Sequence, residues 1–325
     1  MLPDRSAASA PESPSRRSWP ILPAVPEHAG KSPLIPGGDL DLGDPKVVAG
    51  LFDRAARANL DHGGRAGGTQ HLPAAGRAMV SGDLHDHGRN LMRLLKLARL
   101  RERPHHHLIL QELIHGPHRV NGMDLSVRTL ARAAALKLDF PSQVHLLLGN
   151  HELSQSAGDE ILKEGGGVVE AFDRGVSYIY GSGADEVRAA MNRFIASMLL
   201  AVRFAQGIMC THSLPSPRLM AQFDADVIER VPTAADLRSG GSAHMLVWGR
   251  RHSQAQADEL AQRWGVQQFV LGHQPAEMGY LEQEDTMLIL ASDHEHGMAL
   301  PIDLARRYER DELITDLVPL ASIVV

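Results

Sequence analysis

The sequence contains a single cysteine and no long apolar run, and both absences exclude classes of protein. With Cys210 as its only thiol, the chain forms neither an intrachain disulfide nor a cysteine-ligated zinc cluster. No segment approaches the roughly 20 apolar residues of a membrane-spanning helix. The basic pair Arg16-Arg17 is not followed by the apolar stretch of a signal peptide. We therefore expect a soluble cytoplasmic protein without a membrane partner.

Excess basic charge is also missing. The formal net charge is -6, which gives no basic face for the phosphate backbone of DNA or RNA, so no nucleic-acid partner is predicted. Aromatic residues make up only 4% of the chain, yet it contains 18 histidines. Because imidazole binds transition metals and moves protons near neutral pH, this enrichment makes metal chemistry the hypothesis to test.

Composition divides the chain into a leader and one domain. Residues 1–40 are rich in Pro, Ser, Ala and Gly and lack apolar periodicity, which predicts a disordered leader. Residues 41–325 have ordinary apolar and charged content, as expected of one catalytic domain. This domain should begin with an amphipathic helix at 45–59, followed by a Gly-rich loop at 61–76.

Beyond residue 76, short apolar runs alternate with helical patterns, which is typical of a layered α/β fold. Strands are predicted at 77–82, 107–111, 144–148, 207–211, 268–271 and 286–291. Helices are predicted at 89–102, 124–138, 185–204 and 253–264. The apolar residues of the last segment, 312–325, predict a terminal edge strand.

Polar residues follow most of these strands, at the edge where ligands gather in open α/β sheets. They are Asp83 and His85, Glu112, the run Gly149-Asn150-His151-Glu152, His212, and His273. Carboxylate, amide oxygen and imidazole are ligands for hard and borderline cations. If the strand ends converge, these side chains form one metal site.

Taken singly, each cluster also has a purely structural interpretation. An Asp-x-His pair such as Asp83 and His85 is common in turns, and a lone histidine such as His212 is more often a satisfied core residue. Asn150 could form a turn, with Glu152 as a helix-start carboxylate. The weight of the metal hypothesis comes from the shared strand-end position of all the clusters.

Together and in this order, the motifs resemble those of the calcineurin-like metallophosphoesterases, and specifically the serine/threonine phosphoprotein phosphatases. The resemblance covers roughly residues 79–300. Gly82-Asp83-Leu84-His85 matches the family's Gly-Asp-x-His, and Gly149-Asn150-His151-Glu152 is intact. His212 and His273 lie in surroundings similar to those of the family's later metal histidines.

The resemblance implies a four-layer α/β/β/α sandwich and two divalent metal ions, which would be manganese, iron or zinc. It also implies hydrolysis of phosphate monoesters by attack of a metal-bridging hydroxide, without a phosphoenzyme. By motif match, the metal ligands are Asp83 and His85 for one ion and Asn150, His212 and His273 for the other. His151 would donate a proton to the leaving oxygen.

The chain departs from the family pattern after its second strand. The family has Gly-Asp-x-x-Asp-Arg-Gly there, whereas this chain has Gln111-Glu112-Leu113-Ile114-His115-Gly116. Glu112 replaces the bridging Asp; with one more methylene, it could bridge both metals or leave only one metal well bound. His115 replaces the Asp that orients the proton donor, and Gly116 replaces the phosphate-binding Arg.

Other residues could supply the missing positive charge to the phosphate. Arg119 or its neighbour His118 follows Glu112 closely, and Arg250 or Arg251 follows Trp248. A planar guanidinium suits phosphate binding, so Arg119 and Arg250 are the substrate-binding candidates.

Three further motifs receive no firm role. The run His105-His106-His107 could bind metal, but it precedes a strand and is interpreted as a loop-to-strand junction. Asp173-Arg174-Gly175 resembles a phosphate-binding segment of the family, yet it comes before His212 rather than after it. Asp293-His294-Glu295-His296 is equally compatible with a rim of the site and with a polar hairpin.

Two functions remain in competition. The first is a working phosphatase acting on a phosphorylated protein or a small phosphate ester. The alternative is a catalytically impaired metal-binding module that recognises a phosphorylated partner. The departures from the family pattern at Glu112, His115 and Gly116 are compatible with this alternative. The joint retention of the other ligand types favours the enzyme.

Overall fold

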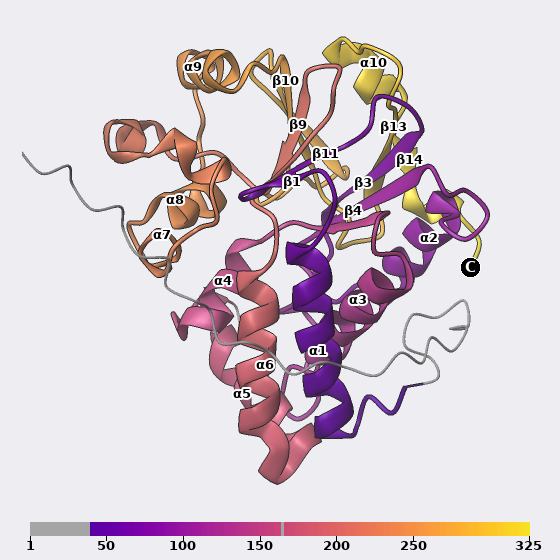
Figure 1. Cartoon of the computed structure of the whole chain (residues 1–325), viewed down its shortest axis with the longest axis vertical. Coiled ribbons are helices and arrows are strands. Elements are labelled where there is room, and N and C mark those ends of the chain that lie inside the picture. Colours follow the sequence, from indigo (N-terminus) through magenta and orange to yellow (C-terminus); the bar gives the residue numbers. More distant parts are fainter. Residues whose placement is uncertain (1–39, 164–165) are drawn as a thin grey trace, which may run out of the picture. The chain divides into compact units, whose positions relative to one another are not determined.

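The computed structural model describes residues 40–163 and 166–325 (Figure 1). The predicted leader at 1–40 lies outside the described residues, apart from Leu40. Within the described ranges, no helix has the length and apolar character needed to cross a membrane.

The first sheet has five strands in the order β14-β13-β3-β4-β5. They are β3 (Arg77–Asp83), β4 (His106–Gln111), β5 (Val144–Leu146), β13 (Met298–Asp303) and β14 (Val318–Pro319). β3, β4 and β5 run parallel, with Ile109 opposite Val80 on one side and His145 on the other. Parallel strands end at the same edge of a sheet, so the loops after β3, β4 and β5 begin together.

The second sheet has seven strands in the order β1-β2-β8-β9-β10-β12-β11. They are β1 (Arg65–Ala66), β2 (Thr69–His71), β8 (Ala201–Arg203), β9 (Ile208–Thr211), β10 (Gln268–Leu271), β11 (Tyr280–Gln283) and β12 (Met287–Leu290). β9, β10 and β12 are parallel, with Val270 opposite Cys210 and Leu288. A separate two-stranded sheet joins β6 (Leu162–Lys163) to β7 (Gly166–Gly167).

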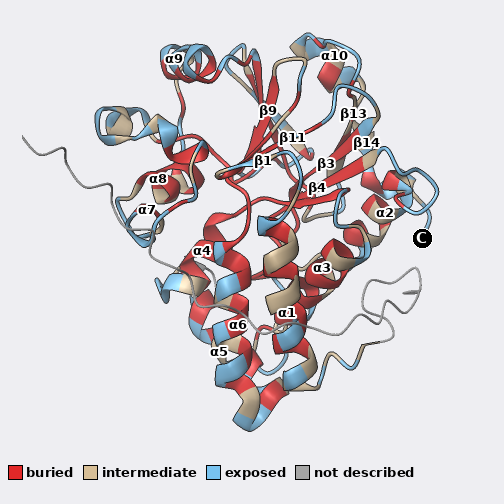
Figure 2. Ribbon diagram, in the orientation of Figure 1, coloured by how far each residue is buried: buried red, intermediate tan, exposed pale blue. Residues whose placement is uncertain are grey.

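The two large sheets pack face to face on an apolar core. Side chains at alternate strand positions fill the interface, as the two-residue period of a strand requires: Ala78, Val80, Ile109, Ile208, Cys210, Val270, Leu288, Leu290, Leu300 and Ile302. The alternate residues of the same strands belong to a second cluster shared with the helices. Burial on both faces explains the continuous apolar runs that predicted the strands, and Figure 2 shows inner strands such as β3, β4 and β9 coloured as buried.

Helices form the outer layers. α2 (Gly88–Ala98) and α3 (Val127–Asp139) contact the five-stranded sheet, while α9 (Gln254–Trp264) packs Trp264 against Phe269 of β10. α1 (Pro45–Leu60) begins at the capping residue Asp44 and packs on α3 and on α6 (Ala184–Ala196). The remaining helices are α4 (Asn150–Ala157), α5 (Val168–Tyr180), α7 (Ala234–Leu237), α8 (Ser242–Trp248) and α10 (Arg310–Thr315). The predicted four-layer α/β/β/α sandwich is confirmed.

Three predicted segments differ most from the structure. The helix predicted at 185–204 ends at Ala196, and its last residues form β8, where Ala201 and Val202 are buried between β2 and β9. The predicted loop at 61–76 contains β1 and β2, which pair with each other and with β8. The predicted edge strand at 312–325 is reduced to β14, because α10 occupies most of its first part and Pro319 has no N–H for a longer ladder.

Candidate metal centre

The carboxyl ends of the parallel strands in both sheets meet, and the predicted site residues lie there. Asp83 ends β3 and forms an isolated parallel bridge with Ala291, just after β12, which joins the two sheets at this point. His212 and His273 follow β9 and β10, and Asn150 opens α4 after β5. The convergence expected from the sequence therefore occurs.

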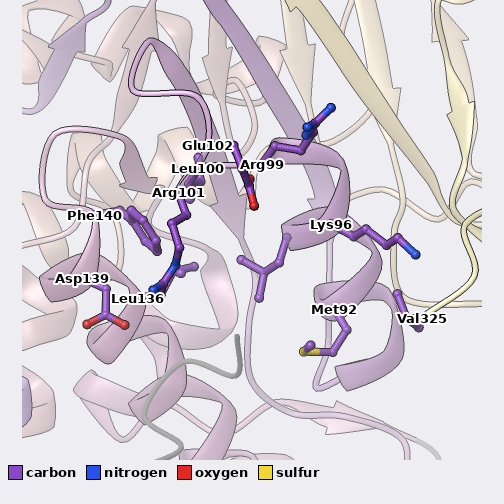
Figure 3. Close-up of a pocket in the computed structure, with 11 residues that line it drawn as sticks. Met92, Lys96, Arg99, Leu100, Arg101, Glu102, Leu136, Asp139, Phe140 and Val325 are labelled. Atoms are coloured by element: carbon purple, nitrogen blue, oxygen red, sulfur yellow. The ribbon is translucent and has the colours of Figure 1, made fainter. Parts of the chain in front are cut away.

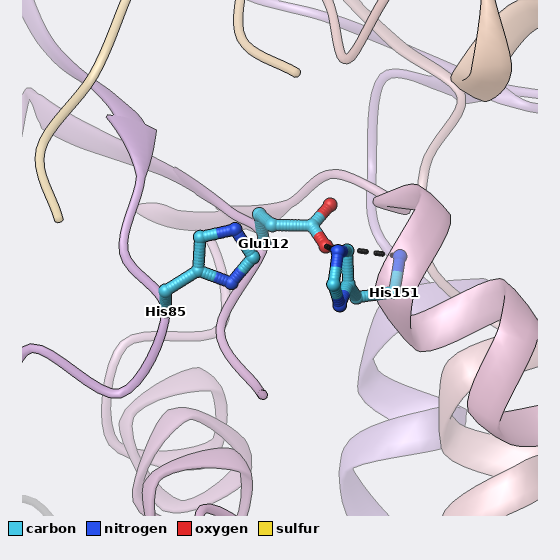
Figure 4. A group of neighbouring side chains, drawn as sticks. All are labelled: His85, Glu112 and His151. Atoms are coloured by element: carbon cyan, nitrogen blue, oxygen red, sulfur yellow. Dashed lines mark hydrogen bonds and ion pairs between the residues drawn. The ribbon is translucent and has the colours of Figure 1, made fainter. Parts of the chain in front are cut away.

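Glu112 is fully buried and lies between His85 and His151 (Figure 4). Its Oε1 accepts a hydrogen bond of 2.9 Å from the backbone N–H of His151 and lies 3.9 Å from Nε2 of the same residue. Its Oε2 lies 2.9 Å from Nε2 of His212. The two carboxylate oxygens thus face different imidazoles.

His85, Glu112 and His151 form a group whose donor atoms all lie within 4.8 Å of one another (Figure 4). Nδ1 of His85 lies 2.9 Å from the carbonyl oxygen of Ile114, so Nδ1 carries the proton and the lone pair lies on Nε2. A histidine oriented in this way could bind a metal ion through Nε2. His151 stands in this group where Asp83 was expected beside His85.

A second group surrounds His212. The Gln111 amide donates to the carbonyl oxygen of Ser81 at 2.9 Å, so its Oε1 accepts from Nδ1 of His212 at 2.9 Å. The lone pair of His212 then lies on Nε2, which is 3.0 Å from Oδ1 of Asn150 and 2.9 Å from Oε2 of Glu112. Three lone-pair atoms this close repel one another unless a cation or a proton lies between them.

His273 completes this group. Its Nδ1 lies 2.7 Å from Oδ1 of Asn150, and its backbone N–H lies 3.0 Å from each carboxylate oxygen of Asp83. Oδ1 of Asp83 is also 3.7 Å from Nδ1 of His212. Asp83 therefore contacts both histidines of the seven-stranded sheet.

The backbone at the site is held in the left-handed region at several non-glycine residues. The φ angle is 41° at His85, 49° at Glu112, 62° at His115 and 67° at His273. Such conformations cost energy and persist where the surrounding structure enforces them, which is common at functional sites.

Two glycines make room for the carboxylates. A Cβ atom on Gly149 would lie 2.1 Å from Oε2 of Glu112, and one on Gly272 would lie 2.2 Å from Oδ1 of Asp83. Both distances are far below van der Waals contact, so any side chain at either position would displace a carboxylate.

Burial dominates the electrostatics of the site. It raises the pKa of Asp83 to about 7 and that of Glu152 to about 8, and the negative charge of Glu112 adds to both shifts. Burial lowers the pKa of His212 and His273, which keeps both rings neutral. Neutral imidazoles beside mutually repelling buried carboxylates are a donor set that a divalent cation would stabilise, so the residues present fit metal ions.

Comparison with known proteins identifies the family. The model of the calcineurin-like phosphoesterases matches residues 76–295, more than half of the chain. The chain belongs to this family. Family membership makes it a metal-dependent phosphoesterase, in agreement with the ligand set described above.

Solved structures agree on the fold of this phosphoesterase. It is similar to a protein serine/threonine phosphatase from Saccharomyces cerevisiae with similarity to human phosphatase PP5, with a TM-score of 0.59 and 16% identity over 84% of this chain and 88% of that chain. A point mutant of a cold-active protein tyrosine phosphatase gives a TM-score of 0.53 and 14% identity over 74% of this chain and 79% of that chain. Curated protein sequences give no match.

The two predicted substrate-binding arginines differ in their positions in the phosphoesterase. Arg250 is exposed, and its Nε donates a hydrogen bond of 3.0 Å to Nε2 of His273. Arg119 lies in the loop after β4, where burial raises the pKa of Asp124 to about 6 and Arg119 opposes that shift. Arg250 is thus the one in contact with a predicted ligand.

The run 293–296 follows β12 and Ser292, whose backbone N–H donates to the carbonyl oxygen of Asp83 at 2.9 Å. Besides burial, the charge of Asp293 raises the pKa of Asp83, so the two carboxylates lie near each other. This position beside Asp83 favours the interpretation of the run as a rim of the site over that of a polar hairpin alone.

Two site residues have roles that the sequence did not reveal. Gln111 fixes the orientation of His212, as described above. Glu152 accepts hydrogen bonds from the backbone N–H groups of Leu113 and Ile114 at 2.6 and 3.2 Å, and so holds the loop that follows Glu112. In the sequence, Gln111 and Glu152 are recognisable only as polar residues close to predicted site residues.

A cavity of about 620 Å³, drawn in Figure 3, lies outside the candidate metal centre. It is bounded by the last turns of α2 and α3 and by the chain end, with Met92, Leu136 and Phe140 among its apolar lining residues. Because parallel βα units place the end of each helix at the start of the next strand, this cavity lies on the opposite side from the metal centre.

Proposed function

We propose that this phosphoesterase hydrolyses phosphate monoesters with two divalent metal ions, in the manner of the serine/threonine phosphoprotein phosphatases. The position of Glu112 carries the proposal: a carboxylate oxygen lies within 4.8 Å of a ring nitrogen of His85, and Oε2 lies 2.9 Å from Nε2 of His212, so the side chain reaches a predicted ligand of each ion. A shared carboxylate offsets the repulsion of two closely spaced cations. Manganese, iron or zinc suits the mixed oxygen and nitrogen ligands.

We assign the ligands as the motifs suggest. Asp83 and His85 would hold one ion, Asn150, His212 and His273 the other, and Glu112 would hold both. Bound ions of this kind lower the pKa of a water molecule and stabilise charge on the phosphate oxygens. The residues of the chain bind the ions, orient the ester and move the proton.

His151 is the proposed proton donor. It would transfer a proton to the leaving oxygen while the bond from phosphorus to that oxygen breaks, so the alcohol leaves as a neutral molecule. Its position supports this role, because its ring lies beside Glu112 and His85 rather than at the protein surface.

Arg250 is the preferred phosphate-binding residue, with Arg119 as the second. Arg250 donates to Nε2 of His273. If His273 binds a metal through Nδ1, its proton moves to Nε2, which can no longer accept a hydrogen bond from Arg250. The guanidinium then turns to other acceptors, and two phosphate oxygens fit its planar geometry best.

The proposed partner is a phosphorylated protein or a small phosphate ester in the cytoplasm. The test is turnover of p-nitrophenyl phosphate and of a phosphoserine peptide with added manganese, with metal content measured on the same sample. His151→Ala should lower turnover by roughly 10²–10⁴, the contribution of one general acid, while its metal content stays near wild type. Bound metal without turnover of either substrate would support the binding module instead.

A further inference from the structure

A chain of hydrogen bonds runs from His151 away from the metal centre to helix α5. Nδ1 of His151 lies 2.8 Å from Nδ1 of His115, and Nε2 of His115 lies 2.9 Å from Oε1 of Gln155. The amide nitrogen of Gln155 donates to Oδ1 of Asp173 at 3.1 Å. His151 and Gln155 both belong to α4, so they project from the same short helix one turn apart.

The far end of this chain decides where the protons lie. The carboxylate of Asp173 only accepts, so the amide NH2 of Gln155 faces it and Oε1 faces His115. That oxygen also only accepts, so Nε2 of His115 carries a proton. In a neutral His115 ring, Nδ1 is then the acceptor, and His151 donates to it through Nδ1–H.

The surroundings of His115 favour the neutral ring. The residue is 2% exposed, and its ring packs edge-on against Phe172 with centroids 5.5 Å apart. Its ring nitrogen Nε2 faces the uncharged amide oxygen of Gln155. A protonated ring would lose its hydration here, and these uncharged surroundings would not offset that cost.

We propose that His115, Gln155 and Asp173 are positioning residues that hold His151 with its proton on Nδ1 and its Nε2 directed at the metal centre. The inference rests on the proposed role of His151 as proton donor. A protonated His151 gives its Nε2 proton to the leaving oxygen and becomes a neutral ring with the remaining proton on Nδ1. This is the tautomer that the chain stabilises, so the transfer requires neither ring rotation nor proton exchange.

Asp173 is itself held in place by α6. Nε of Arg188 lies 3.4 Å from Oδ1 of Asp173, and a terminal nitrogen of Arg188 donates to the Asp173 carbonyl oxygen at 3.0 Å. The Asp173 side chain is 44% exposed, whereas Gln155 as a residue is 6% exposed. Water can partly replace Asp173, so removal of the Gln155 amide should have the larger effect.

The first test compares leaving groups. Gln155→Met keeps the side-chain length and removes both hydrogen bonds. We expect kcat for phenyl phosphate to fall roughly 10-fold, a part of the 10²–10⁴ that one general acid provides. For p-nitrophenyl phosphate, whose leaving group needs less protonation, kcat should fall less than about 2-fold. KM and metal content should not change.

Two further variants locate the effect. Asp173→Asn keeps the shape of the side chain but can donate as well as accept. Its kcat should fall less than that of Gln155→Met, and the fall should again be larger with phenyl phosphate than with p-nitrophenyl phosphate. Asp185→Asn removes the charge of another partner of Arg188, at 2.8 Å, without touching the hydrogen bonds from His151 to Asp173, and should behave as wild type. Equal losses with both phosphates in Gln155→Met, or no loss at all, would overturn the proposal.

The second test does not depend on turnover. In the zinc-loaded protein, long-range proton–nitrogen NMR correlations of the imidazoles distinguish protonated from unprotonated ring nitrogens. At neutral pH we expect the proton of His151 on Nδ1 and that of His115 on Nε2. The opposite assignment for His151 refutes the proposed chain even in an active enzyme, whereas the expected assignment in an inactive protein refutes only the phosphatase function.

Discussion

Glu112 replaces an aspartate of the family pattern, and its role can be tested by removing its charge alone. Glu112→Gln keeps the size of a fully buried side chain. We expect the variant to bind at most one metal ion and to lose more activity than His151→Ala, because the repulsion between two cations is no longer offset. Metal analysis and turnover on the same purified sample give the measurement.

Glu112→Asp is the matched variant, because it retains the charge and shortens the reach. Oε2 of Glu112 lies 2.9 Å from Nε2 of His212. A side chain one methylene shorter should not reach both metal sites, and the variant should lose much of its activity. Two bound metals with near-normal turnover in Glu112→Gln would rule out the bridging role.

Among single residues, the sequence predicted the candidate metal ligands better than the residues that hydrogen-bond to the site histidines. Histidines and carboxylates at strand ends could be recognised, because metal chemistry requires those groups. Gln111 and Gln155 could not, because their roles depend on which end of an amide faces a neighbour, and only the fold decides that. His115 was recognised as a departure, but its partner Gln155 was not.

Among the elements, the buried parallel strands were the most predictable. The apolar runs that form β3, β4, β9 and β10 end in polar residues, so both the strands and their ends could be inferred. The end of α6 could not, because the run from Met198 to Val202 is apolar throughout, which suits a buried helix as well as a buried strand. Only pairing with β2 and β9 selects the extended form, and pairing partners distant in the sequence leave no local pattern.

The turn between β5 and α4 is predicted to require a glycine for space rather than for backbone freedom. Gly149 has φ -94° and ψ 166°, which alanine also adopts, so Gly149→Ala tests only the added Cβ atom. That atom would meet Oε2 of Glu112 at 2.1 Å. We expect loss of bound metal and a decrease in the free energy of unfolding of roughly 1–3 kcal/mol, typical of overpacking.

Gly88→Ala is the control for this variant, because a Cβ atom at the start of α2 has no neighbour within 4 Å. Its metal content and melting temperature should match those of the wild type. Normal metal content in Gly149→Ala would show that Glu112 can move without consequence.

For the whole molecule, buried histidines far from the metal centre should make stability depend on pH. Nδ1 of His107 lies 3.1 Å from Nε2 of His145, across the starts of β4 and β5. Burial lowers the pKa of His107 to about 4, and that of His145 well below its ordinary value. Between about pH 6.5 and 4 the unfolded chain therefore binds more protons than the folded one, so stability falls as the pH falls.

His107→Gln should flatten this dependence, by roughly 2–3 kcal/mol over that pH range. Chemical unfolding at several pH values measures it. His105→Gln changes an exposed histidine of the same run and should leave the dependence intact. The same slope in all three proteins would assign the acid sensitivity to other groups.

Metal binding should stabilise the molecule as a whole, because its candidate ligands come from both large sheets. Asp83 ends one strand of the five-stranded sheet and Glu112 follows another, while His212 and His273 follow strands of the seven-stranded sheet. Manganese at about 100 times its Kd would add about 2.7 kcal/mol, which corresponds to roughly 5–10 °C in melting temperature. Chelation should remove this increment and added manganese should restore it. Glu112→Gln, with fewer ions to lose, should respond less; an equal response in this variant would show that the stabilising ion does not depend on Glu112.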